Sequence, residues 1–106
     1  MDKEIYKVIR EYRKRLEALG FKVRKTILYG SHATGNARED SDIDLVIISE
    51  DFRNMDTWER LCLLGRARMG IKRPIEILGL TQEELESEDV ITFISDEIKS
   101  KGIEVK

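Results

Sequence analysis

Two polar motifs near the middle of the chain carry residue types that suit phosphate and metal chemistry. Gly30-Ser31 follows an apolar segment, where a tight turn into a short helix would present backbone N–H groups and a hydroxyl to a phosphate. Asp42 and Asp44 begin the next apolar segment, and their spacing places both carboxylates on the same side of a strand. Two such carboxylates repel each other unless a cation lies between them, and oxygen ligands beside phosphates favour Mg²⁺.

A third carboxylate, Glu76, lies within the apolar segment of residues 75–78. An acidic side chain in a buried strand is costly unless it is paired or bound to a metal. If this strand lies beside the one that carries Asp42 and Asp44, the three carboxylates could hold two Mg²⁺ ions, an arrangement used for in-line phosphoryl or nucleotidyl displacement. The alternative is an ion pair between Glu76 and a nearby lysine or arginine.

The elements that must position these residues follow from the spacing of apolar side chains and from helix-capping signals. The predicted helices span residues 3–19, 56–69 and 89–99, with short helices after Gly30-Ser31 and after Thr81, and the predicted strands span residues 23–29, 43–48 and 75–78. This alternation favours an α/β (α+β) fold in a single domain over residues 1–106: a small mixed sheet of about three to four strands packed with helices.

Composition narrows the class of protein further. The formal net charge of −2 argues against an obligate nucleic-acid binder, although residues 1–30 carry nine basic against four acidic side chains. The single cysteine, Cys62, excludes an internal disulfide, and no apolar run reaches the ~18 residues of a membrane span. We therefore expect a cytoplasmic protein with Cys62 as a buried thiol and no membrane partner. The scarcity of Asn and Gln beside many charged residues favours a thermophilic source.

The combination of Gly30-Ser31, ten intervening residues and Asp42-Ile43-Asp44 resembles the signature of the DNA polymerase β-like nucleotidyltransferase superfamily. The short chain is similar to the minimal nucleotidyltransferase (MNT) domains of that superfamily, and the likeness covers nearly all of it. Gly-Ser alone and Asp-x-Asp alone are weak signals, but the two motifs at this spacing, each beside a predicted strand, are a specific one.

The resemblance implies a role for each motif residue. Gly30 and Ser31 would hold the β- and γ-phosphates of a nucleoside triphosphate such as ATP. Asp42 and Asp44 would ligate two Mg²⁺ ions, and Glu76 stands where the family places its third metal-binding, catalytic carboxylate. The family more often has Asp at that position, so the longer Glu side chain changes the geometry of the metal that activates the acceptor hydroxyl.

The resemblance also implies a partner, because larger members of the superfamily carry an additional helical domain for the acceptor. Minimal nucleotidyltransferases are often paired with a separate all-helical HEPN protein as antitoxin and toxin. The leading hypothesis is therefore a Mg²⁺-dependent enzyme that moves AMP from ATP to a hydroxyl of such a partner. The alternative is a non-catalytic module that binds nucleotide or metal and neutralises a partner by contact. A homodimer or a hetero-oligomer is compatible with either hypothesis.

Two other motif assignments fail on residue identity. A Walker A loop needs Lys and Ser or Thr after its second glycine, where this sequence has Asn36 and Ala37. A calcium-binding EF-hand loop beginning at Asp40 needs Gly and Glu at the positions of Leu45 and Asp51.

Several neighbours of the motifs have simpler structural interpretations. His32 is expected to be a half-exposed helix residue and Arg38 a solvated loop charge, while Thr34 and Gly35 shape the turn. Trp58 is expected in the core or in an interface.

Overall fold

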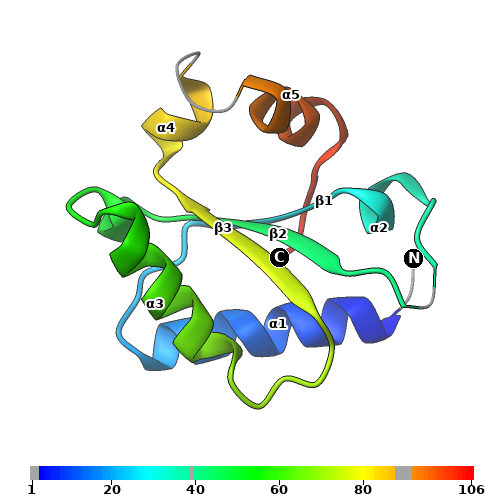
Figure 1. The fold of residues 1–106 in the computed structure, drawn as a ribbon, viewed down its shortest axis with the longest axis horizontal. Helices are drawn as coiled ribbons and strands as arrows, with labels where there is room; N and C mark the ends of the chain where they lie inside the picture. Colours follow the sequence, from blue (N-terminus) through cyan, green and yellow to red (C-terminus); the bar gives the residue numbers. More distant parts are fainter. Residues whose placement is uncertain (1–2, 39, 88–91) are drawn as a thin grey trace.

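A four-stranded mixed sheet with helices on both faces forms the framework of the protein, which we describe from a computed structural model covering residues 3–38, 40–87 and 92–106 (Figure 1). The helices are α1 (Lys3–Ala18), α2 (Ser31–Thr34), the 3-10 helix η1 (Glu50–Phe52), α3 (Thr57–Arg68), α4 (Gln82–Glu86) and α5 (Thr92–Lys101). The strands are β1 (Lys25–Tyr29), β2 (Ile43–Ile48), β3 (Ile75–Leu80) and β4 (Ile103–Glu104).

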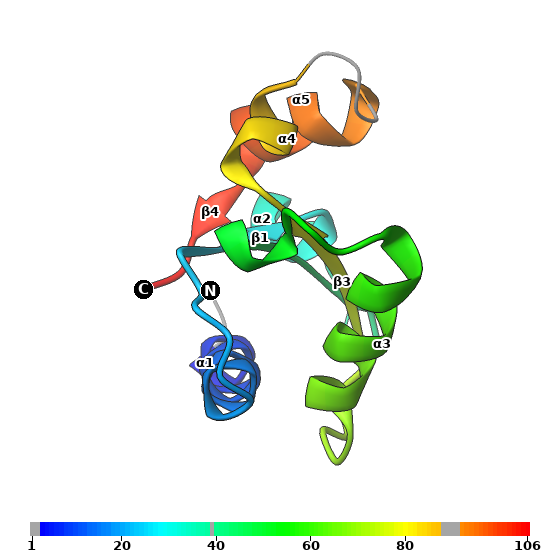
Figure 2. The ribbon, with the colours of Figure 1, turned by 90° about the vertical axis from the view of Figure 1, so that its left-hand side faces the viewer.

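The sheet has the strand order β3-β2-β1-β4. β1 pairs antiparallel with β2 and with β4, whereas β2 and β3 run parallel. The α1 and α3 helices cover one face, and α4 and α5 cover the other, as Figure 2 shows. Five of the six residues of β2 are fully buried, which agrees with the prediction of a central strand from its apolar sequence.

The two faces of the sheet support cores of different size. The larger one packs α1 and α3 against alternate residues of the strands, among them Leu28, Leu45 and Ile75. The smaller one packs the other set of residues, including Val46, against Leu85 of α4 and Ile98 of α5. Strand side chains alternate between faces, so the residues that share parity with Val46 point towards α4 and α5.

Local signals in the sequence account for the helix starts. Asp56 caps α3 by accepting a hydrogen bond from the Glu59 backbone N–H at 2.8 Å, and the Glu59 side chain reaches back to the Asp56 N–H. Thr81 and Glu84 form the same reciprocal capping box at the start of α4. Each capping box satisfies two donors that the first turn of a helix would otherwise leave unpaired.

The structure confirms the predicted fold class and most predicted elements, with corrections at three places. β3 extends to Leu80, and the C-terminal segment forms the edge strand β4, which the sequence analysis missed because only two residues pair. Cys62 is exposed rather than buried. Trp58 is 72% exposed, which excludes the core, and its predicted alternative place in an interface stays a prediction. The start of the predicted helix over residues 89–99 lies partly outside the described residues. No helix in the described part of the chain is long and apolar enough to cross a membrane.

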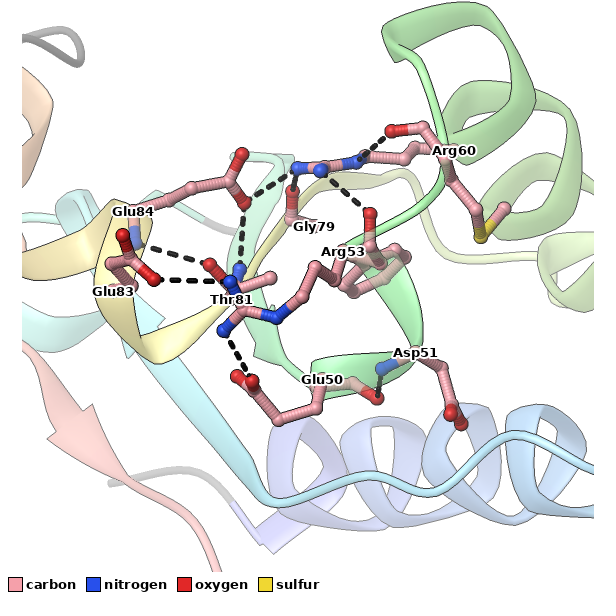
Figure 3. A network of polar contacts seen from close by, with 11 residues as sticks. Glu50, Asp51, Arg53, Arg60, Gly79, Thr81, Glu83 and Glu84 are labelled. Atoms are coloured by element: carbon pink, nitrogen blue, oxygen red, sulfur yellow. Dashed lines mark hydrogen bonds and ion pairs between the residues drawn. The ribbon is translucent and has the colours of Figure 1, made fainter.

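An arginine network fastens η1, α3, β3 and α4 together at one end of the sheet (Figure 3). The Arg60 guanidinium donates to the backbone carbonyls of Phe52, Met55 and Gly79 and pairs with Glu84 at 2.7 Å. The Glu84 carboxylate also accepts from the Thr81 backbone N–H at 2.8 Å. Burial alone would raise the pKa of Glu84, but the bonds to Arg60 and Thr81 hold that pKa below its ordinary value.

Candidate functional site

The parallel pairing of β2 with β3 brings two of the predicted site carboxylates together. Asp44 and Glu76 are register partners on these adjacent strands. Neighbouring strands lie about 4.8 Å apart, so the two side chains leave the sheet side by side. Both share the parity of Val46 and Leu78. Asp44 is half-buried, whereas Glu76 is exposed on the edge strand β3, so the prediction of a buried position for Glu76 was wrong. The Glu76 carboxyl interacts directly with that of Asp44.

Gly30 closes the site from the end of β1. Its backbone has a φ of +74°, a left-handed conformation that favours glycine, and it leads into α2. A Cβ added at this position would lie 2.3 Å from Oδ2 of Asp44, so the carboxylate rests directly against the bare Cα. Tyr29, the residue before the turn, is the register partner of Asp44 on β1. The predicted motif residues Gly30 and Asp44 are therefore in contact.

The electrostatics of the site reflect a concentration of negative charge. The pKa of Asp44 is raised to about 6, first by burial and then by Glu76 and Asp42, with His32 opposing the rise. Glu76 and Asp42 add to the effect of burial because each nearby negative charge disfavours ionisation of Asp44. Asp42 itself is exposed just before β2, and its influence on Asp44 shows that it borders the same site.

Two residues that the sequence analysis did not single out also border the site. Burial raises the pKa of Tyr29, and so do the carboxylates of Asp44, Glu76 and Glu97. Glu97 lies on α5, so this helix contributes a further acidic side chain near the sheet face. Tyr29 immediately precedes Gly30, and this position could have been used to predict that Tyr29 borders the site. The position of Glu97 depends on how α5 docks, which no local motif encodes.

Other predicted neighbours take simple structural roles. His32 lies on α2, and its Nε2 is 3.1 Å from the backbone carbonyl of Ser41, which ties α2 to the loop before β2. Arg38 is exposed in that loop, as predicted. Ser31 is half-buried at the first position of α2, directly after the N-cap residue Gly30.

The carboxylates of the site are suitable ligands for a hard divalent cation, although their side chains do not surround a position for one. Asp44 and Glu76 are adjacent and Asp42 lies on their border, and carboxylate oxygens are the ligands that Mg²⁺ prefers. Among the described residues, no three His, Cys, Asp or Glu side chains are gathered closely enough to hold a metal ion. Burial is the first cause of the raised pKa of Asp44, and the charges of Glu76 and Asp42 add to it; a cation held by these carboxylates would oppose that second contribution.

Comparison with known proteins identifies the family to which the chain belongs. The sequence matches the family of nucleotidyltransferase domains over residues 7–105. A relative from Methanocaldococcus jannaschii, described as "Putative protein adenylyltransferase MJ0141", is 27% identical over 103 residues, which are 96% of this chain and 99% of the relative. The chain belongs to the nucleotidyltransferase domain family.

Solved structures share the fold at low sequence identity. A crystal structure described as a "putative nucleotidyltransferase" from Sulfolobus solfataricus superposes with a TM-score of 0.70 at 18% identity, over 95% of this chain and 78% of the other. A toxin–antitoxin structure with AMP-PNP gives a TM-score of 0.65 at 18% identity, over 92% and 71% of the two chains. A mutant of the toxin–antitoxin pair MntA–HpeT, with two aspartates changed to glutamate, gives 0.63 at 15% identity over the same shares.

Proposed function

We propose that this protein is a Mg²⁺-dependent nucleotidyltransferase that moves AMP from ATP to a hydroxyl group of a partner protein. The observation that carries the proposal is the contact of Asp44 with both Glu76 and the bare Cα of Gly30. These residues come from three different strands or turns, yet they converge on one point of the sheet. That convergence supplies carboxylates for a metal beside a turn that a phosphate can approach closely.

In this proposal, each residue has a defined task. Gly30 and Ser31 bind the β- and γ-phosphates through backbone N–H groups and the serine hydroxyl, and so orient the triphosphate. Asp42, Asp44 and Glu76 would hold Mg²⁺, which when bound supplies positive charge against the phosphates and the acceptor oxygen. The acceptor hydroxyl loses its proton and its oxygen bonds to the α-phosphorus, while the bond from that phosphorus to the β-phosphate oxygen breaks and pyrophosphate leaves. Most of the rate comes from holding these groups in line.

The comparisons support a protein as the acceptor of AMP. The Methanocaldococcus jannaschii relative is described as a protein adenylyltransferase, and it matches almost the whole chain. Two structural neighbours are toxin–antitoxin proteins, and one of them was crystallised with an ATP analogue. An all-helical HEPN protein acting as a toxin is therefore the partner we propose, with this chain as the antitoxin.

A non-catalytic module that neutralises its partner by contact is the second candidate. The specific observation in its favour is that the described carboxylates do not gather into a group of three as placed. Such a module would still bind nucleotide or metal at Asp44 and Glu76 without transferring AMP.

Transfer of label from α-labelled ATP to a purified HEPN partner separates the two candidates. We expect Mg²⁺-dependent labelling of the partner, release of pyrophosphate, and loss of both with Asp44→Asn. Asp40→Asn is the matched control, because Asp40 is exposed in the loop before β2 and is not among the groups that raise the pKa of Asp44. A partner that is inhibited without becoming labelled would favour the non-catalytic module. Full activity of Asp44→Asn would contradict any role of this site.

A further inference from the structure

One face of α3 exposes a row of apolar side chains to solvent. Trp58 is 72% exposed, Leu61 54% and Met69, just past the end of the helix, 71%. Cys62 is exposed between them. At about 100° per residue, Trp58, Cys62 and Met69 fall within a sector of about 40°, opposite the side chains that pack on the core. We call Trp58, Leu61, Cys62, Gly65 and Met69 the α3 stripe.

The glycine of the α3 stripe has no explanation within one copy of the chain. Gly65 is exposed in the interior of α3, where glycine costs about 1 kcal/mol relative to alanine. A Cβ added there would meet no atom within 4 Å, so nothing in its own chain requires glycine. A small residue at the centre of an exposed apolar row lets a second helix approach closely. Figure 2 shows that α3 lies at the outer edge of the molecule, where a second helix could reach it.

Two copies of the α3 stripe can pack against each other when their helices run in opposite directions. If two copies of α3 cross antiparallel about a point between residues 63 and 64, Trp58 lies opposite Met69 of the second copy. Cys62 then lies opposite Gly65, so a larger side chain meets the smallest one at the centre. A small side chain near the crossing point allows two helices to approach closely.

The charges beside the α3 stripe select the antiparallel direction. Glu59 and Arg66 lie on the same flank of the helix, about 80–100° from the middle of the stripe. In an antiparallel pair the same flanks meet, so Glu59 of each copy faces Arg66 of the other. A parallel pair would instead place Arg66 against Arg68 of the second copy. Arg66 forms no ion pair with any other described residue, so it is available for such a contact.

We infer that two copies of this chain associate through antiparallel packing of the α3 stripe. The contact involves one three-turn helix of each copy, so the expected dissociation constant is weak, on the order of 10–100 µM. Asp44 has the parity of Val46 and so points to the face of the sheet opposite α3. Glu76, at the edge strand β3, instead borders a pocket that Leu61 and Gly65 also line. The inference rests on the residues of α3 and stands whether or not the protein transfers AMP.

Analytical ultracentrifugation over a concentration series tests the dimer directly. The wild-type mass should rise from 12.3 kDa towards twice that value between about 1 µM and 1 mM. Leu61→Glu should leave the chain monomeric throughout, with unchanged circular dichroism because the side chain is exposed. Leu19→Glu is the matched control, since Leu19 is also exposed, at 45%, but lies outside the α3 stripe. A wild-type mass of 12.3 kDa at 1 mM overturns the inference, and it is the result expected if the stripe binds a different protein.

Charge reversal tests the direction of the helices. Arg66→Glu and Glu59→Arg should each weaken association about tenfold, and the double variant should recover most of the wild-type affinity. Glu59 also takes part in the capping box of α3, but the double variant keeps that defect, so its recovery reports the intermolecular pair alone. A bifunctional maleimide should join the two Cys62 thiols in the wild type and not in Leu61→Glu. A double variant that dissociates like the single variants, or a dimer that survives Leu61→Glu, overturns the inference.

Discussion

Carboxylates at the two ends of the parallel strand pair β2–β3 have opposite electrostatic surroundings. At the end where β3 leads into α4, Arg60 satisfies three backbone carbonyls and the Glu84 carboxylate. At the beginning of the same strands, Asp44 and Glu76 stand side by side next to Asp42. The first cluster holds the pKa of its carboxylate below the ordinary value, and the second raises the pKa of Asp44 to about 6.

This difference separates a structural cluster from a candidate binding site. A neutralised network lowers the energy of the folded chain alone, so its removal should cost stability. A cluster of like charges raises the energy of the folded chain, and a cation that binds to the cluster lowers that energy again. Substitutions at the two ends of β3 should therefore change stability in opposite directions.

The largest expected effect belongs to Arg60. Its side chain is only 14% exposed, and Arg60→Ala would leave the carbonyls and the partner carboxylate without their donor. We expect a loss of about 3 kcal/mol in the free energy of unfolding, measured by urea denaturation. Arg53→Ala is the control, because Arg53 pairs with Glu50 and Glu83 at the surface and should change stability little. Equal losses for the two variants would contradict a special role for the Arg60 network.

Gly30→Ala should have the second largest effect. The substitution places a Cβ 2.3 Å from Oδ2 of Asp44 at a φ of +74°, and we expect a loss of about 2 kcal/mol together with weaker binding of MgATP. Gly35→Ala is the control, since its φ is +79° but its added Cβ would meet nothing within 4 Å. The control should show only the backbone penalty of about 1 kcal/mol. If both variants lose the same stability, the close approach of Asp44 to Gly30 is wrong.

Much of this arrangement could be predicted from the sequence because it is locally encoded. The run from Ile43 to Ile48 had to be a central strand, since five of its six residues are apolar, and the structure buries those five. The capping boxes at Asp56 and Thr81 fixed two helix starts within a residue. The structure brings Asp44, Glu76 and Gly30 together, as the proximity of the motifs required, while their roles in binding metal and phosphate stay predictions.

The rest depends on contacts between distant segments. The burial of Cys62 was predicted wrongly, and of the two places predicted for Trp58 the core is excluded, because an apolar row at helical spacing does not reveal which face of α3 meets the sheet. The two-residue strand β4 carries too few residues to give an alternating pattern. The network of Arg60 with carbonyls of other elements has no sequence signature, because backbone acceptors are present everywhere.

Asp44→Asn should change stability in the opposite direction to Arg60→Ala. Because folding raises the pKa of Asp44 from 3.8 to about 6, the folded state binds more protons between these values, and its stability falls as the pH rises through them. At pH 7 the variant should be more stable than the wild type by on the order of 1 kcal/mol, after allowance for solvent screening at this partly exposed group.

Urea unfolding at two pH values measures this effect. The advantage of Asp44→Asn should be present at pH 7 and should disappear below about pH 4, where the wild-type carboxyl is protonated in both states. Millimolar Mn²⁺ should stabilise the wild type and not the variant, while Asp40→Asn should behave like the wild type in both measurements. An Asp44→Asn protein that is less stable at pH 7 would mean that the carboxylate is compensated in the folded chain.

Ser31→Ala should have the smallest effect on the fold and therefore gives the sharpest view of ligand binding. Ser31 is half-buried at the first position of α2, and Gly30 is the N-cap, so removal of the serine hydroxyl should leave the free energy of unfolding within about 0.5 kcal/mol of the wild type. If its hydroxyl donates to a phosphate, the affinity for MgATP measured by calorimetry should fall about five- to tenfold. Thr34→Ala removes a hydroxyl from the same helix, but that hydroxyl already donates to the carbonyls of Gly30 and Ser31, so nucleotide affinity should not change. Equal affinity of the wild type and Ser31→Ala would leave phosphate binding to the backbone of the turn and remove the hydroxyl from the proposed site.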